Sequence, residues 1–309
     1  MTLPPIIPVT TPITMPIRWP LEAIWEAVAP GLPGFTAEVL PRIDSSNTEL
    51  MRRFKGSSNT GPRPEPILLV AEEQTAGRGR LGRSWLSQRG DSLTFSLGLP
   101  LQPADWSGLS LAVGISLADS LEPDSTDFRI GLKWPNDVWL AGNTSESVKK
   151  GEQNFSKLAG ILVETASWEG LRYVVIGVGI NICALELPSL VTANSASALP
   201  EPMPKLMPTP MPSIPPGHLQ ALLPGLDAAQ TLLRVVPPLV QAVQAFEQSG
   251  FAPFQARFAR RDVLCGRAVT LSDGTAGTAC GVSDNGALRV HTLAGMKEVT
   301  SSEVSVRPC

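Results

Sequence analysis

The sequence predicts an α/β or α+β protein, in which helices pack against a mixed β-sheet and a small unit of short strands follows. Residues 67–71, 93–99 and 174–182 are apolar runs with the length of strands. Residues 109–121 carry an apolar stripe at helical spacing. From residue 261 to 309, short β-branched runs alternate with Asp-Gly, Asn-Gly and Ala-Gly turns, which is typical of a small β-barrel.

The main body is expected to span residues 35–260, after a proline-interrupted leader at residues 1–34. The leader contains one short helical pattern, at residues 21–29. Residues 35–43 form the first expected strand. The first helix of the body, at residues 47–54, follows a Ser-Asn turn whose side chains suit a helix N-terminus.

The second half of the body continues the alternation, with a sheet that resumes through residues 128–182. Further helical patterns follow at residues 218–235, 238–248 and 251–260. Two insertions interrupt this order: a polar one at residues 142–156 and a longer one at residues 183–217. Eight prolines between residues 200 and 216 exclude a helix or a central strand there, so we expect a disordered or polyproline surface loop.

Composition narrows the class of protein. The net charge of −3, from 25 basic and 28 acidic residues, argues against general nucleic-acid affinity. The leader is too short for an N-terminal winged helix-turn-helix, so a DNA-binding role is not expected. Four cysteines without metal spacing suggest a reducing interior, and no run reaches the roughly 18 apolar residues of a membrane span. A soluble cytoplasmic enzyme is expected.

The most informative segment is residues 74–85 (QTAGRGRLGRSW), which places three arginines on a glycine-rich loop. Glycines permit close backbone approach, and the forked guanidinium groups of Arg78, Arg80 and Arg83 are suited to surround an anion. A solvated basic hairpin would explain a single arginine better than it explains three. The loop therefore indicates a site for phosphate or a phosphate-like intermediate.

The same loop matches the dinucleotide-binding pattern Gly77-x-Gly79-x-x-Gly82. That motif requires a strand before the glycines and a helix after them, whose N-terminus faces the pyrophosphate. Here residues 67–71 supply the strand, but residues 93–99 predict another strand instead of the helix. A nicotinamide or flavin enzyme is therefore disfavoured.

Three later segments place polar residues at the ends of strands. Residues 133–137 (KWPND) end an apolar run, and the proline turns the chain there. Residues 157–164 (KLAGILVE) place a lysine at the mouth of a strand. Residues 174–182 (VVIGVGINI) form a strand that ends in small residues and one amide. Each has a purely structural explanation on its own, such as a turn, a snorkelling lysine or a bulged strand.

In this order and spelling, the four segments resemble the biotin protein ligases, which attach biotin to a lysine of carboxyl-carrier domains. The similarity is close over roughly residues 40–182 and continues more faintly to the C-terminus, at residues 286–288 and 302–307. The resemblance implies a catalytic domain like those of class II aminoacyl-tRNA synthetases and biotin or lipoate ligases. It also implies a C-terminal domain with a Src-homology-3-like β-barrel.

The resemblance carries over to a set of biotin-contacting positions. These are Ser45, Ser46, Asn47, Gln74, Arg78, Gly79, Arg80, Lys157 and Gly160. Ser46 stands where threonine is usual, and it keeps the hydroxyl group that donates and accepts hydrogen bonds. Leu81 departs from the pattern, because many relatives have a further arginine there.

The resemblance also implies a nucleotide side of the pocket. The matching positions are Arg80, Arg83, Trp85, Asn136, Asp137, Lys157 and Asn181. Asp137 is the candidate ligand for a Mg²⁺ ion that accompanies ATP. The residues expected to act in catalysis are Lys157, Arg78 and Arg80.

The implied chemistry has two steps. The biotin carboxylate first attacks the α-phosphorus of ATP, and cationic side chains reduce the repulsion between these two anions. The acceptor lysine then attacks the mixed anhydride and expels AMP, so no side-chain nucleophile is required. We expect the Arg78 loop to be mobile when empty and ordered over the adenylate, where it shields the anhydride from water.

The expected partner is a biotin carboxyl carrier protein, and a homodimer is a further option. Two other functions stay open from the sequence. A lipoate ligase or octanoyltransferase shares the fold but lacks the repeated-arginine loop and the KWPND turn. A non-catalytic biotin-binding regulator is suggested by Leu81 and the insertions.

Overall fold

The computed structural model describes residues 16–56, 64–123, 127–142, 154–184, 215–300 and 306–308. Most of residues 142–156, most of residues 183–217 and the start of the predicted closing strand at 302–307 lie outside these ranges. The predictions made for both insertions therefore lie outside the described residues.

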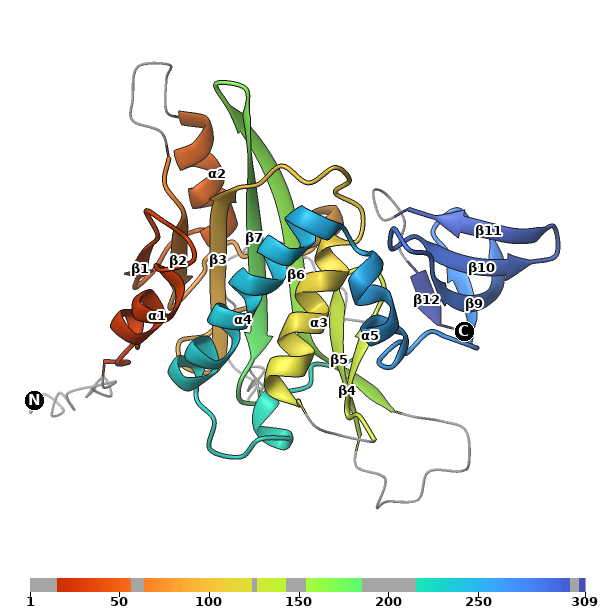
Figure 1. The fold of residues 1–309 in the computed structure, drawn as a ribbon. Coiled ribbons are helices and arrows are strands. Elements are labelled where there is room, and N and C mark those ends of the chain that lie inside the picture. The colour runs from red at the N-terminus through yellow and green to blue at the C-terminus, as the bar shows by residue number, and fades with distance from the viewer. Residues whose placement is uncertain are drawn as a thin grey trace, which may run out of the picture.

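The body is built on a seven-stranded mixed sheet in the order β1-β2-β3-β7-β6-β5-β4 (Figure 1). β1 runs parallel to β2, and every other neighbouring pair is antiparallel. The strands are β1 (Thr36–Leu40), β2 (Ile67–Ala71), β3 (Ser92–Pro100), β4 (Ile130–Lys133), β5 (Asp137–Ala141), β6 (Phe155–Trp168) and β7 (Leu171–Asn181). The predicted mixed sheet is confirmed, although the first strand ends at Leu40 and not at Ile43.

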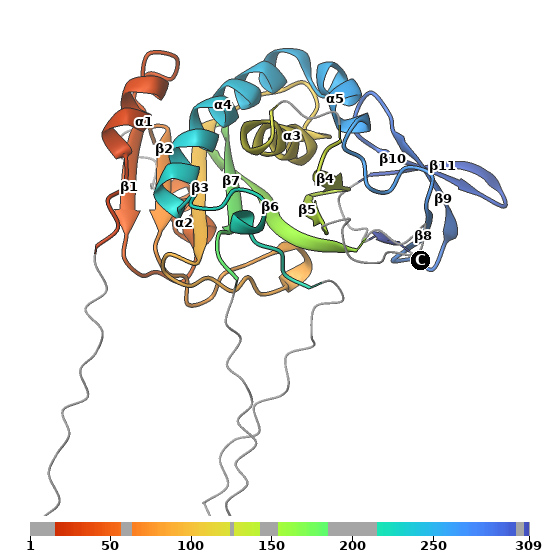
Figure 2. The ribbon, with the colours of Figure 1, turned by 90° about the horizontal axis from the view of Figure 1, so that it is seen from below.

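Helices cover both faces of this sheet (Figure 2). They are α1 (Leu21–Val28), α2 (Ser46–Gly56), α3 (Leu109–Leu121), α4 (Ala228–Ser249) and α5 (Gln255–Ala259). The alternation of side chains along β2 supplies both faces: Leu68 and Val70 join the core under α3 and α4, whereas Leu69 joins a second core under α2. The helices predicted at residues 21–29, 47–54 and 109–121 are confirmed.

The prediction of separate helices at residues 218–235 and 238–248 is wrong. One long helix, α4, runs through both, and residues 219–221 form only a 3₁₀ turn. The helix begins after Asp227, because the Asp227 carboxylate accepts a hydrogen bond from Gln230 N at 2.7 Å while the Gln230 side chain accepts from Asp227 N at 3.2 Å.

Pro237 and Pro238 misled the prediction, because each removes a hydrogen bond from a helix interior. Here the neighbouring Val236 and Leu239 are fully buried in the core. Burial of that apolar face outweighs the two missing backbone bonds, so the helix continues. The helix predicted at residues 251–260 is likewise shorter: a 3₁₀ turn at Ala252–Phe254 leads into α5.

The C-terminal unit is a five-stranded antiparallel sheet in the order β11-β10-β9-β8-β12. Its strands are β8 (Ala268–Leu271), β9 (Ala276–Val282), β10 (Leu288–Thr292), β11 (Gly295–Val299) and β12 (Val306–Pro308). This confirms a small β domain at the C-terminal end.

The short strand β4 joins this unit to the body. Leu132 N donates to Arg261 O at 2.7 Å, and Val263 N donates to Leu132 O at 3.1 Å. Trp134 Nε1 donates to Gly286 O at 3.1 Å from the strand's end. Arg261 is almost fully buried and bonds Asp119, Glu122 and the backbone of β4, which fixes the junction.

Among the described residues, we find no helix with both the length and the apolar character needed to cross a membrane.

Candidate functional site

The site lies at one row of paired residues on the neighbouring strands β5, β6 and β7. Asp137 on β5 pairs with Gly160 on β6, and Gly160 pairs with Gly179 on β7. The loop at residues 74–85 folds over this row. Strand register therefore brings together three segments that are far apart in the sequence.

The arginine loop is closed by its own backbone. Gly79 N donates to Arg83 O at 2.7 Å, and Trp85 N donates to Gly77 O at 2.9 Å. Residues 80–82 form a 3₁₀ turn in which Leu81 adopts a left-handed φ of 56°. A strand follows the loop, so the helix required by the dinucleotide motif is absent there and that interpretation is rejected.

Trp85 reaches from the loop onto the two glycines of the row. A Cβ added at Gly160 would lie 3.2 Å from the Trp85 ring, and one added at Gly179 would collide with it. These glycines are therefore required for close approach of the ring. The indole Nε1 is buried, and no hydrogen-bond partner for it occurs within the described ranges.

One side of the site is a network of neutral hydrogen-bonding side chains, made of Ser45, Ser46, Asn47, Gln74 and Ser96, which we call the neutral wall. Ser46 N donates to Gln74 Oε1 at 2.7 Å. Ser96 Oγ lies 2.8 Å from Ser46 Oγ and donates to Asn47 Oδ1 at 2.6 Å. The two serines of the turn and Asn47 are at most 4 % exposed. The predicted biotin-contacting turn is thus an ordered, interlocked unit.

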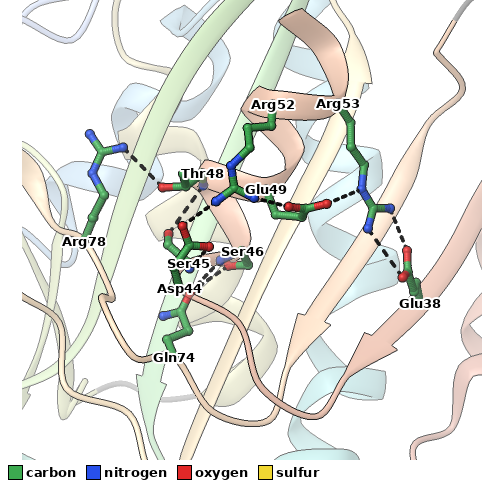
Figure 3. A network of polar contacts seen from close by, with 10 residues as sticks. All are labelled: Glu38, Asp44, Ser45, Ser46, Thr48, Glu49, Arg52, Arg53, Gln74 and Arg78. Atoms are coloured by element: carbon green, nitrogen blue, oxygen red, sulfur yellow. Dashed lines mark hydrogen bonds and ion pairs between the residues drawn. The ribbon is translucent and has the colours of Figure 1, made fainter. Parts of the chain in front are cut away.

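The neutral wall is positioned by the start of α2 (Figure 3). Ser45 Oγ accepts a hydrogen bond from Thr48 N at 3.4 Å, which caps the helix. Behind it, Arg52 bonds both Asp44 and Glu49. Slight burial raises the pKa of Asp44. Hydrogen bonds from Ser45 N and Arg52 together lower it by more, so the pKa of Asp44 lies below its ordinary value.

Arg78 lies at the rim, between α2 and β6. Its Nη2 is 3.5 Å from Glu164 Oε1, and its Nη1 donates to Thr48 Oγ1 at 3.4 Å. Glu164 Oε2 also accepts from Asn47 Nδ2 at 3.0 Å. Glu164 therefore connects the arginine loop with the neutral wall.

The opposite side of the site is charged and consists of Arg80, Arg83, Lys133, Lys157 and Asp137, which we call the cationic cluster. Lys157 Nζ lies 2.7 Å from Asp137 Oδ1 and 5.5 Å from the centre of the Trp85 ring. Lys133 Nζ lies 3.7 Å from Asp137 Oδ2. Two lysines thus share one carboxylate, which also attracts Arg80.

Burial changes the proton affinity of this cluster. Desolvation lowers the pKa of Lys133, with Asp137 opposing the shift and Lys157 and Arg83 adding to it. Desolvation also lowers the pKa of Arg80, again against the attraction of Asp137. An incoming anion would favour the charged form of both groups.

Two amides predicted to lie on the nucleotide side bond the backbone through their Nδ2 atoms. Asn136 Nδ2 donates to Ile161 O at 2.7 Å. Asn181 Nδ2 donates to Lys157 O at 3.1 Å and to Gly217 O at 2.9 Å. Both therefore fix the strand that presents Lys157.

Asp137 does not fit the predicted role of a Mg²⁺ ligand. Both its oxygens face lysine ammonium groups, which a metal ion would have to displace. In the described part of the chain, no group of three or more His, Cys, Asp or Glu side chains is placed to hold an ion. Magnesium is commonly held by substrate phosphates, so a nucleotide could carry it without this residue.

Three residues of the site were missed by sequence reasoning: Lys133, Ser96 and Glu164. Lys133 and Glu164 stand in segments that were singled out, but each looked like the end of a strand. Ser96 lies within the apolar run of β3 and gave no signal. A small polar residue inside such a run was the available clue, since a buried hydroxyl requires a partner.

Fold and site together define a class of protein: an α/β body with a small β domain, whose site combines a neutral wall with a cationic cluster. Such a combination of groups suits a ligand with an uncharged head and an anionic end.

Comparison with known proteins identifies the family. A model described as the biotin/lipoate A/B protein ligase family matches residues 39–181, and one described as the biotin protein ligase C terminal domain matches residues 264–307. The bifunctional ligase/repressor BirA of Escherichia coli is 32% identical over 89% of this chain and 75% of its own length. This chain belongs to the biotin protein ligase family.

Further relatives agree. The biotin--[acetyl-CoA-carboxylase] ligase of Paracoccus denitrificans is 29% identical over 86% of this chain and 98% of its own length. The biotin protein ligase from Aquifex aeolicus, solved in complex with biotin and ATP, superposes with a TM-score of 0.63 at 26% identity. That match covers 89% of this chain and 99% of the Aquifex chain.

Proposed function

We propose that this protein joins biotin to ATP to form biotinyl-5'-AMP and then transfers the biotinyl group to a lysine of a biotin carboxyl carrier protein. The observation that carries the proposal is the cationic cluster beside the neutral wall. The relatives named for biotin ligation, and a related structure that holds both biotin and ATP, support the same reaction.

In the first step, a carboxylate oxygen of biotin attacks the α-phosphorus of ATP and pyrophosphate leaves. Lys157 and Arg80 lie on the side where the two anions meet, and Arg78 lies at the rim. Fixed positive charge in a partly desolvated site stabilises the growing charge without reorganisation. A Mg²⁺ ion carried by the triphosphate would neutralise charge on the departing pyrophosphate.

The neutral wall is proposed to bind the fused rings of biotin. Urea N–H and C=O groups need paired donors and acceptors, and the hydroxyl and amide groups of Ser45, Ser46, Asn47 and Gln74 offer both. In the second step, the neutral acceptor amine attacks the carbonyl of the mixed anhydride and AMP leaves. Orientation of the two reactants is the protein's main contribution to this step.

Biotin-dependent exchange of labelled pyrophosphate into ATP tests the first step, and biotinylation of a purified carrier domain tests the second. Exchange that depends on lipoate or octanoate, and not on biotin, would identify a lipoate-type relative. Absence of exchange with every acid would identify a binding protein without ligase activity.

We also propose a homodimer formed through the outer edge of β1, because this strand pairs only with β2 in the described sheet. Light scattering with and without biotin and ATP measures the mass. Cys183, Cys265 and Cys280 are free thiols, which suits a reducing, cytoplasmic setting.

A further inference from the structure

Asp137 lies between two lysines that come from different strands. Lys133 is the last residue of β4 and is the register partner of Asp137 on β5. Lys157 lies near the start of β6 and approaches the other carboxylate oxygen. The contacts are unequal: 2.7 Å to Lys157 and 3.7 Å to Lys133.

The two lysines also differ in access. The Lys157 side chain is 33% exposed, whereas that of Lys133 is 10% exposed and lies 5.5 Å from the centre of the Trp139 ring. Lys157 can therefore reach a bound molecule. Lys133 is enclosed, and its ammonium group stays beside Asp137.

Lys157 cannot pair closely with Asp137 and with the reacting anions at the same time. Its ammonium group would have to turn from Asp137 toward the carboxylate and phosphate. The Asp137 side chain, only 14% exposed, would then lose its nearest partner. A buried carboxylate without a partner is strongly unfavourable, and it would also repel the incoming anions.

We propose that Lys133 is a positioning residue that neutralises Asp137 when Lys157 turns toward the substrates. Lys133 holds the carboxylate from its enclosed side, so that Lys157 is released at little cost. The other charges that face this group are Arg83 and Arg80, which belong to the loop and not to the strand pair. This inference rests on the proposed adenylation reaction.

The test compares wild type, Lys133→Met and the double variant Lys133→Met/Asp137→Asn in biotin-dependent pyrophosphate exchange. In Lys133→Met, Asp137 retains Lys157 as its sole partner of the pair, so kcat should fall on the order of 100-fold while KM for biotin stays near wild type. Removing the carboxylate in the double variant should restore a large part of kcat. Lys297→Met, in the C-terminal domain, is the matched control.

A second readout does not depend on activity. Acetylation of Lys157 by acetic anhydride, followed by mass spectrometry, should be slower in Lys133→Met than in wild type and should recover in the double variant. Thermal unfolding shows whether each variant is folded.

The outcomes separate the two proposals. Absence of exchange in wild type overturns the proposed function. Wild-type exchange with a normal kcat in Lys133→Met overturns the role of Lys133. A double variant no faster than Lys133→Met, with Lys157 acetylation unchanged throughout, also overturns it.

Discussion

The neutral wall and the cationic cluster belong to the same site but are built in opposite ways. In the neutral wall, Ser46, Asn47, Gln74 and Ser96 satisfy one another through hydrogen bonds of 2.6 to 3.1 Å. In the cationic cluster, two lysines share Asp137, and burial disfavours the charge of Lys133 and Arg80. The groups of the neutral wall bond one another, whereas the cluster holds four basic groups and one acidic group.

This difference suggests that the two sides of the site have separate roles, one in binding and one in the chemical step. A set of groups already bonded to each other can hold an uncharged ring with little rearrangement, which favours affinity and selectivity. A surplus of positive charge is relieved only when anions arrive, which favours the step in which two anions meet. Changes on the two sides should therefore alter different kinetic constants.

Removing the ammonium group of Lys157 should have the largest effect. Lys157→Ala is expected to slow biotin-dependent pyrophosphate exchange by about 100- to 1000-fold, because it removes charge from the reacting atoms. The midpoint of thermal unfolding should change little, since the Lys157 side chain is partly exposed and Lys133 still pairs with Asp137. Lys297→Ala, an exposed lysine in the small domain, is the control. An exchange rate equal to wild type in Lys157→Ala would contradict the proposed role of the cationic cluster in adenylation.

Gly177→Ala should disturb the neutral wall without touching a charge. A Cβ at this position would collide with Asn47 Oδ1 and displace the amide from Ser96 and Glu164. Loss of such bonds corresponds to about a 10- to 100-fold rise in the Kd for biotin, measured by calorimetry. Gly31→Ala, where the nearest atom to the added Cβ is 3.8 Å away, should leave affinity unchanged. An equal Kd for biotin in both variants would contradict the proposed role of the neutral wall in biotin binding.

Arg78→Ala tests the contact that links the two sides. The side chain is half exposed, so stability should barely change, whereas adenylation should slow by about tenfold because the loop loses its ties to Glu164 and Thr48. Glu164→Gln sharpens the result, because it removes the ion pair but keeps an oxygen that accepts from Asn47 Nδ2. Stopped-flow measurement of adenylate formation distinguishes the two variants. Equal rates in both would assign the effect to the ion pair alone.

Asp262 provides the effect most separate from catalysis, as a partly buried carboxyl that lacks the lysine partners of Asp137. Burial raises its pKa to about 6, despite hydrogen bonds from the backbone of Leu264 and Cys265. The unfolded value is near 4, so the folded state binds this proton more tightly. The resulting stabilisation is present below about pH 4 and is lost as the pH rises through 6.

Asp262→Asn should therefore flatten the decline in the free energy of unfolding between pH 4 and pH 7. The expected difference is at most about 3 kcal/mol, measured by urea unfolding at several pH values. Asp284→Asn, at an exposed position, is the control. A decline of the same steepness in both variants would show that Asp262 titrates normally.

The sequence predicted the strands and the arginine loop because their signals are local. Branched apolar runs specified β2 and β3, and glycines with arginines specified the loop. Pro237 and Pro238 gave a false signal, since the long-range burial that keeps α4 intact is not visible in a local pattern. Asn136 and Asn181 were recognised as polar strand ends, but only the tertiary structure shows that their amides bond the backbone.

The contacts of the residues that sequence reasoning missed depend on how strands and helices pair in the folded protein. Lys133 meets Asp137 because β4 and β5 pair there, and Ser96 meets Asn47 because α2 crosses β3. Neither meeting follows from spacing along the chain.

The shared strand β4 has a mechanical consequence. At Leu132 it is bonded to the entry of the C-terminal domain, and one residue later it carries Lys133. We expect removal of that domain to free β4 from its backbone bonds to residues 261 and 263 and to displace the neighbouring Lys133. A truncated enzyme would then lose catalytic rate even if the C-terminal domain never touches a reactant.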